Sequence, residues 1–113
     1  MKDFLFVFRA DMRNMPQRTE EEAKANTQKW MDWVGSIAAQ NKLADRGARL
    51  EQVGKVVMPN DLITDGPYTE IKESIGGFIT VRTESLDEAV LLAKGCPILT
   101  NGGNVEVREV SVM

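Results

Sequence analysis

Residues 4–8 have the sequence FLFVF, and every side chain in this run is apolar. Successive side chains of a β-strand point to opposite faces of its sheet, so residues 4–10 predict a strand that needs cover on both faces. A strand of this kind belongs at the centre of a sheet. The run is too short to span a bilayer or to form the core of a signal peptide, which favours a cytoplasmic protein without a membrane segment.

Two helices are predicted from capping boxes, one made by Thr19 and Glu22 and the other by Ser85 and Glu88. The first box precedes apolar residues at steps of three and four, which predicts a long helix over about residues 19–42. The second box precedes a shorter apolar stripe and predicts a short helix.

The two tryptophans of the first helix differ in their position relative to its apolar stripe. Trp30 lies on the stripe and is expected in the core. Trp33 lies off the stripe and is expected at an interface, where aromatic residues are enriched.

Three further stretches predict strands. Residues 50–58 are rich in valine and follow Gly47, which ends the predicted helical region, so they are expected to form a strand or one arm of a short hairpin. Residues 78–83 alternate between apolar and polar side chains, as a strand does. Residues 105–112 form the last predicted strand, and a change of phase in its apolar residues indicates a bulge or a bend near Arg108 and Glu109.

The order strand, helix, strand, strand, helix, strand matches the ferredoxin-like βαββαβ pattern of an α+β protein. Two helices then cover one face of a four-stranded antiparallel sheet. The other face keeps apolar residues, because the first strand is apolar on both sides. A second copy of the chain is the simplest cover for that face, so we expect a homodimer.

Composition narrows the possible functions. The 113 residues correspond to one domain over residues 1–113, and the net charge of −3 without clustered lysine or arginine argues against nucleic-acid binding. The chain has no histidine, which excludes imidazole-based catalysis and removes the commonest transition-metal ligand. Cys96 is the single cysteine, follows Gly95 at a helix end, and is expected to be buried and unreactive. No metal or cofactor is implied.

Several segments together carry a family resemblance. Residues 64–73 (TDGPYTEIKE) and 76–78 (GGF) resemble the DGPF signature. Residues 85–89, 95–97 and 105–108 resemble the second helix, the end of that helix and the closing strand of the same family. The sequence is therefore similar to the YCII-related, DGPF-motif family over nearly its whole length.

The resemblance implies a dimeric α+β barrel, in which the sheets of two ferredoxin-like subunits pack face to face, with a possible small-molecule pocket between the sheet and the loops. It implies no settled activity, since a fold does not fix function. The sequence departs from the family in two ways. Tyr68 replaces the phenylalanine of the motif, and the His-Asp pair invoked for catalysis in YCII-type relatives cannot form without a histidine.

Asp65 is the sharpest catalytic candidate. A carboxylate at the mouth of a pocket can act as a general base or bind a polar ligand. An aspartate beside Gly66 and Pro67 also commonly closes a turn by accepting hydrogen bonds from nearby backbone amides. Both interpretations are open from the sequence.

Five further residues are candidates for ligand binding. Tyr68, Glu70 and Lys72 share one side if their segment is extended, which groups a phenol, a carboxylate and an ammonium. Arg9 and Arg82 lie near the ends of central strands and are suited to bind a carboxylate. Either arginine is equally suited to pair across strands with an acid such as Glu106.

Three functions are compatible with these features. The leading hypothesis is a homodimer that binds a small polar or aromatic molecule in its barrel. The second is a cofactor-independent isomerase or lyase with Asp65 as the base. The third is an accessory protein in transcription regulation that acts through a protein partner.

Overall fold

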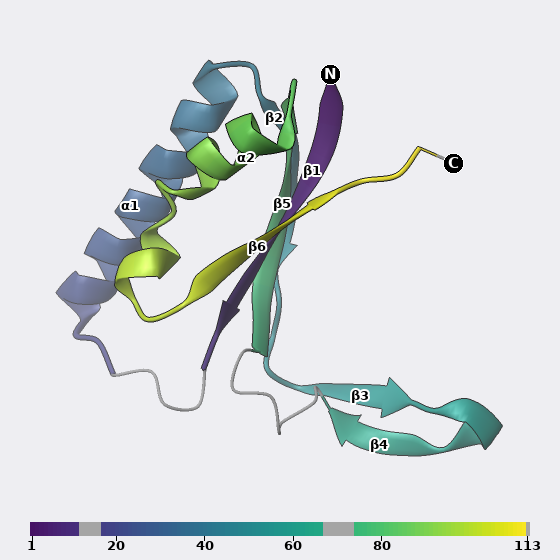
Figure 1. The fold of residues 1–113 in the computed structure, drawn as a ribbon. Helices are drawn as coiled ribbons and strands as arrows, with labels where there is room; N and C mark the ends of the chain where they lie inside the picture. The colour runs from purple at the N-terminus through teal and green to yellow at the C-terminus, as the bar shows by residue number, and fades with distance from the viewer. Residues whose placement is uncertain (12–16, 67–73, 113) are drawn as a thin grey trace.

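The computed structural model of the chain describes residues 1–11, 17–66 and 74–112 and shows an α+β fold (Figure 1). Four strands form the main sheet in the order β2-β5-β1-β6, and all neighbours are antiparallel. These strands are β1 (Lys2–Ala10), β2 (Leu43–Arg49), β5 (Ser74–Thr83) and β6 (Asn104–Glu109). The strand order confirms the ferredoxin-like prediction.

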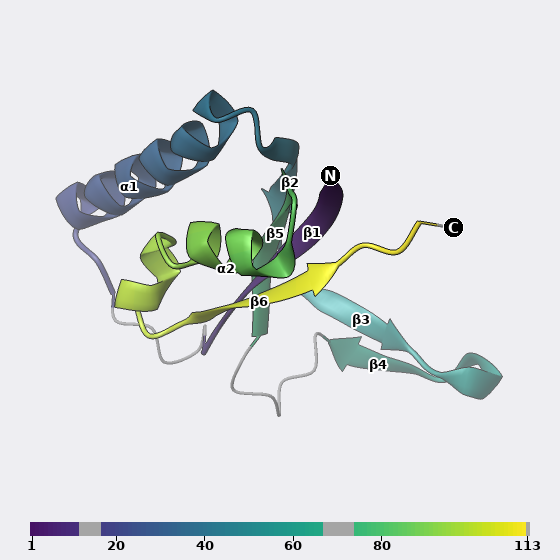
Figure 2. The same cartoon turned by 45° about the horizontal axis from the view of Figure 1, so that its top comes forward.

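Two helices, α1 (Glu20–Ala39) and α2 (Leu86–Ala93), lie on the same face of this sheet (Figures 1 and 2). The hydroxyl of Thr19 accepts a hydrogen bond from the Glu22 backbone amide, and the Glu22 carboxylate accepts one from the Thr19 amide, which confirms the first capping box. At the second box, the Ser85 hydroxyl accepts from the Glu88 amide. Neither described helix combines the length and apolar character that crossing a membrane requires.

Strand β1 is central, as predicted, because it pairs with β5 on one side and β6 on the other. Phe4, Phe6 and Phe8 point toward the helices and are buried. Leu5 and Val7 point to the opposite face and are only half-buried. The described residues of the chain therefore cover one face of the sheet and leave the other uncovered; we call the latter the open face.

Trp33 lies in the core, so the prediction of an interface position for it is wrong. Its side chain is 8% exposed, and its indole nitrogen donates a hydrogen bond to the Leu92 carbonyl oxygen at 3.0 Å. A Cβ at Gly95 would lie 3.1 Å from its indole ring, so the absence of a side chain at Gly95 leaves room for the ring. The end of α2 thus gives α1 a second packing surface, which the stripe of α1 alone does not reveal.

The second strand of the main sheet is β2, whereas the sequence predicted residues 50–58 for this place. Gly47 lies inside β2 with a φ of +62°, and a Cβ there would collide with the Phe78 carbonyl oxygen, so glycine is required. Asp45 and Gly47 are of residue types with little strand propensity. Pairing with β5 therefore determines this edge strand.

Residues 50–66 form a hairpin arm, one of the two forms predicted for this region. Strand β3 (Gly54–Val57) pairs with β4 (Ile63–Gly66) in a two-stranded sheet, and η1 (Pro59–Asp61) makes the tip. The arm projects from the main sheet on the side opposite the helices (Figures 1 and 2).

Strand β6 pairs with β1 in one continuous register from Asn104 to Glu109. Of the two alternatives predicted near Arg108 and Glu109, the bulge is therefore wrong. The change of phase in the sequence instead marks the end of the strand, because Val110 follows it and is 45% exposed.

Candidate functional site

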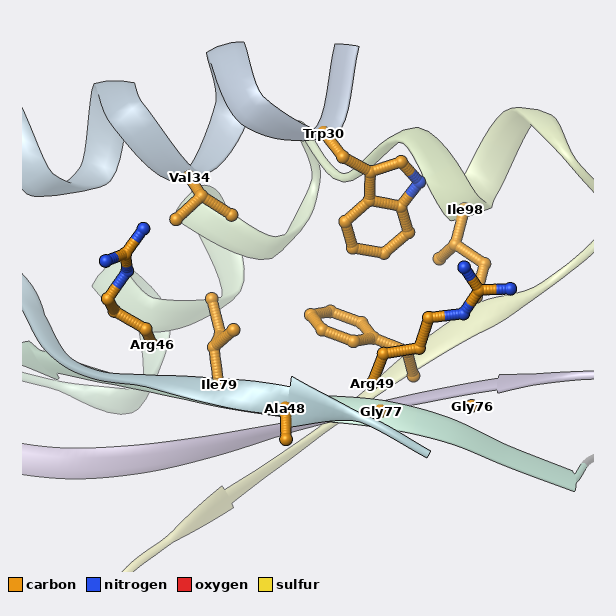
Figure 3. A pocket seen from close by; sticks show the side chains of 10 residues that line it. Trp30, Val34, Arg46, Ala48, Arg49, Gly76, Gly77, Ile79 and Ile98 are labelled. Carbon is orange, nitrogen blue, oxygen red and sulfur yellow. The ribbon is translucent and has the colours of Figure 1, made fainter. Parts of the chain in front are cut away.

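A cavity of about 310 Å³ lies between α1 and the main sheet (Figure 3). This volume is at the lower end of the range of small-molecule pockets. Most of its wall is apolar. The apolar side chains come from Phe8, Trp30, Val34, Ile79 and Ile98.

The aromatic part of the wall is fixed by edge-to-face packing. The ring centroids of Phe8 and Trp30 are 4.8 Å apart at an interplanar angle of 82°. Trp33 lies behind both, with centroids 5.8 Å from Phe8 and 5.8 Å from Trp30. These distances are typical of favourable aromatic pairs, so the wall is formed before any ligand binds.

Two arginines of β2 line the same cavity. Figure 3 shows Arg46 and Arg49 on the helix side of the strand, whereas the Ala48 side chain points away. Residues three apart in a regular strand face opposite sides. A bulge changes this, because Arg46 and Gly47 together oppose one residue of β5 between the pairs Asp45–Thr80 and Ala48–Phe78.

The bulge is stabilised by the backbone conformation of Gly47 and by the side chain of Asp45. Gly47 supplies the left-handed conformation, and its amide donates a hydrogen bond of 2.6 Å to the Asp45 carboxylate. The segment DRGAR therefore places two guanidinium groups on one side of an edge strand.

Both guanidinium groups are available to an anion. Within residues 1–11, 17–66 and 74–112, no acidic side chain forms an ion pair with Arg46 or Arg49. A guanidinium can bind a carboxylate or phosphate through two parallel hydrogen bonds. The cavity thus combines an aromatic body with two cationic groups at its edge.

The arginines predicted as ligand-binding residues are each paired with an acid. Arg9 donates to the Glu106 carboxylate at 3.0 Å, which is the cross-strand alternative considered above. Arg82 donates to the Asp3 carboxylate at 2.8 Å. Both pairs belong to the open face, away from the cavity beneath α1. A ligand-binding role for Arg9 and Arg82 stays a prediction.

These ion pairs change the acidity of the carboxyl groups. Hydrogen bonds from Arg108 and then Arg9 hold the pKa of Glu106 below its usual value. The hydrogen bond from Arg82 does the same to the pKa of Asp3. Both carboxylates are therefore charged at neutral pH, and both neutralise the cations beside them.

Asp65 belongs to β4, where its backbone pairs with that of Lys55. The predicted turn continues into Pro67, which lies outside the described residues. Its role as a base stays a prediction. Tyr68, Glu70 and Lys72, the other candidates of the DGPF-like segment, lie outside the described residues.

Sequence reasoning did not single out Arg46 or Arg49. The signal that could have identified them is the glycine between them, since a glycine inside a strand commonly marks a bulge. That signal is usable only once residues 43–49 are recognised as a strand.

Cys96 is buried, as predicted, and burial raises the pKa of its thiol to about 12. It is therefore protonated at neutral pH and a poor nucleophile. In the described part of the chain, no group of three or more acidic, cysteine or histidine side chains is arranged to hold a metal ion.

Comparison with known proteins agrees with the resemblance seen in the sequence. The profile of the YCII-related domain matches residues 10–113. A search of curated protein sequences finds no significant match. Because the profile match covers almost the entire chain and the α+β architecture is the one the resemblance implies, the chain belongs to the YCII-related domain family.

Proposed function

We propose that this protein works as a homodimer in which each subunit binds a small anionic molecule with an aromatic or otherwise apolar body. The binding site is the cavity beneath α1. The observation that carries this proposal is that Arg46 and Arg49 face one apolar cavity and have no acidic partner among the described residues. The proposal is one of binding, and it names no turnover.

The apolar wall of the cavity suits the apolar body of a ligand, and the two arginines suit its anionic group. Removing apolar surface from water stabilises a complex by about 25 cal/mol per Å². A hydrogen bond to a charged group adds about 1.5–3 kcal/mol, provided the ligand supplies the opposite charge. An aromatic carboxylate or phosphate satisfies both conditions, whereas a neutral aromatic molecule satisfies only the first.

The open face supports the homodimer. Leu5, Val7 and Phe78 form its apolar centre, and they are half-buried by their neighbours within the sheet. The Arg82–Asp3 ion pair lies toward one end of this face. An apolar centre with a polar, paired margin is the composition typical of a protein interface.

Titration with matched probes tests the ligand class. Phenylacetate carries the expected anion, phenylacetamide is its neutral analogue, and phenyl phosphate distinguishes a phosphate from a carboxylate preference. We expect either anion to raise the melting temperature of the protein and to bind at least tenfold more tightly than the amide in calorimetry.

Variants locate the site. Arg49→Gln and Arg46→Gln each remove one cation, and we expect each to weaken anion binding about 10- to 150-fold, which corresponds to about 1.5–3 kcal/mol. Arg18→Gln is the matched control, because Arg18 is exposed and does not line the cavity. Equal affinity for phenylacetate and phenylacetamide, or no effect of the cavity variants, would contradict the proposal.

A further inference from the structure

The hairpin arm exposes an unusual number of apolar side chains. Val53, Val57, Leu62 and Ile63 are between 57% and 91% exposed. The backbone of Val57 pairs directly with that of Ile63, so these two side chains share one face of the arm. The arm thus presents an apolar surface at some distance from the core.

The shape of the chain confirms that the arm projects. The radius of gyration is 15.6 Å. A compact domain of this length has a radius of gyration of about 13 Å. A two-stranded hairpin on its own is at best marginally stable in water, so a surface that packs against the arm is needed.

The direction of the arm indicates where that surface lies. The arm and the C-terminal end both leave the main sheet on the side of its open face (Figures 1 and 2). The nine residues from 50 to 58 span about 30 Å when extended, at about 3.3 Å per residue. Two packed sheets are only about 10 Å apart, so a second sheet on the open face would lie within reach of the arm.

The area of the open face is a second reason to expect the arm to contact a second copy of the chain. Four strands about 4.8 Å apart, with about six paired residues each, give a footprint of about 380 Å². A stable interface of standard size buries about 800 Å² per partner. The two four-residue strands of the arm offer about 130 Å² on one face by the same strand dimensions, which supplies part of the shortfall.

We infer that the arm packs its apolar face, with Val57 and Ile63, against the second copy of this chain, so that each subunit of the homodimer is held by the arm of the other. The arm and the open face belong to the same side of one chain. A two-fold pairing of open faces therefore brings both arms against their partners at once, without any further component. This inference rests on the homodimer proposed above.

Sedimentation velocity of the full chain over a range of concentrations tests the arm contact. Val57→Asp and Ile63→Asp each place a charge on the apolar face of the arm, and we expect each to raise the dimer dissociation constant at least tenfold. Leu91→Asp is the control, because Leu91 is 66% exposed on α2, on the other side of the sheet. All three positions are exposed in the single chain, so circular dichroism should show unchanged folding.

The outcomes separate the two proposals. A wild-type chain that stays monomeric at every concentration overturns the homodimer and the arm contact with it. A wild-type dimer whose dissociation constant is the same in all three variants overturns the arm contact alone. Hydrogen exchange adds an independent readout, since amide protection in the arm of the wild-type protein should rise with concentration only if the second copy covers it.

Discussion

The two faces of the main sheet differ in how far their apolar side chains are buried and in whether their arginines are paired with acids. On the helix face, the phenylalanines of β1 are buried and two arginines line a cavity without an acidic partner among the described residues. On the open face, the apolar side chains of β1 stay half-buried and the arginines are paired with carboxylates. Under the proposed function, the arginines without an acidic partner bind the ligand, and the arginines paired with carboxylates lie at the margin of the homodimer interface.

The largest expected effect contrasts adjacent residues of β1. Phe6 is fully buried on the helix face, so Phe6→Ala should reduce the free energy of unfolding by about 3–5 kcal/mol. Val7 faces the open side, so Val7→Ala should cost much less at low protein concentration. Urea denaturation at several concentrations measures both.

The concentration dependence makes this comparison sharper. If a second copy covers the open face, the cost of Val7→Ala grows with protein concentration, because dimerisation stabilises the folded state by mass action. The cost of Phe6→Ala comes mainly from the core of one subunit and should change much less. An equal, concentration-independent cost at both positions would show that the two faces do not differ as described.

The second prediction concerns the bulge that places both arginines on the helix face. Gly47→Ala puts a Cβ where φ is +62° and where the Phe78 carbonyl oxygen lies, so β2 must shift. We expect a loss of about 1–3 kcal/mol in stability and a further loss of anion binding at the cavity. Denaturation and calorimetry measure the two effects separately.

Gly35→Ala is the control for this substitution. Gly35 lies inside α1, and no atom lies within 4 Å of the Cβ that alanine would add. Alanine is favoured over glycine inside a helix by about 1 kcal/mol, so this variant should be slightly more stable and should bind the anion normally. Normal anion binding by Gly47→Ala would mean that the bulge does not position the arginines.

A structural feature of this chain can be predicted from the sequence where the residues that determine it lie close together along the chain. The apolar run of β1 and the Thr19 capping box each lie within a few residues, and the central strand and the helix start that they predict are confirmed. The position of Trp33 was wrong because its packing surface comes from Gly95 and Leu92, which lie far along the chain.

The candidate site was missed for the same physical reason. Strand β2 has a weak intrinsic strand propensity and forms because β5 offers an edge to pair with. Its sequence alone therefore does not predict a strand. Without the bulge, alternation places Arg46 and Arg49 on opposite faces, and no shared cavity is predicted. A site that depends on an irregularity in an edge strand is recognised only from the pairing of that strand.

The smallest expected effect tests the neutralised arginines of the open face by pH. The pKa of Glu106 is held below its usual value of 4.5 by Arg108 and Arg9. A carboxyl group whose pKa is lower in the folded state stabilises the fold above its unfolded pKa, and this stabilisation is lost as the pH falls through the folded pKa. Glu106→Gln should therefore lower the melting temperature slightly at pH 7 and not at all well below pH 4.

The effect of Glu106→Gln should be small, because this ion pair is largely exposed and salt screens it. Added salt should therefore reduce the difference at pH 7. Glu51→Gln serves as the control, since Glu51 is exposed and forms no ion pair within the described part of the chain. A difference between wild type and Glu106→Gln that persists unchanged below pH 4 would show that Glu106 acts through packing, and the contrast between paired and unpaired arginines would then lose its electrostatic basis.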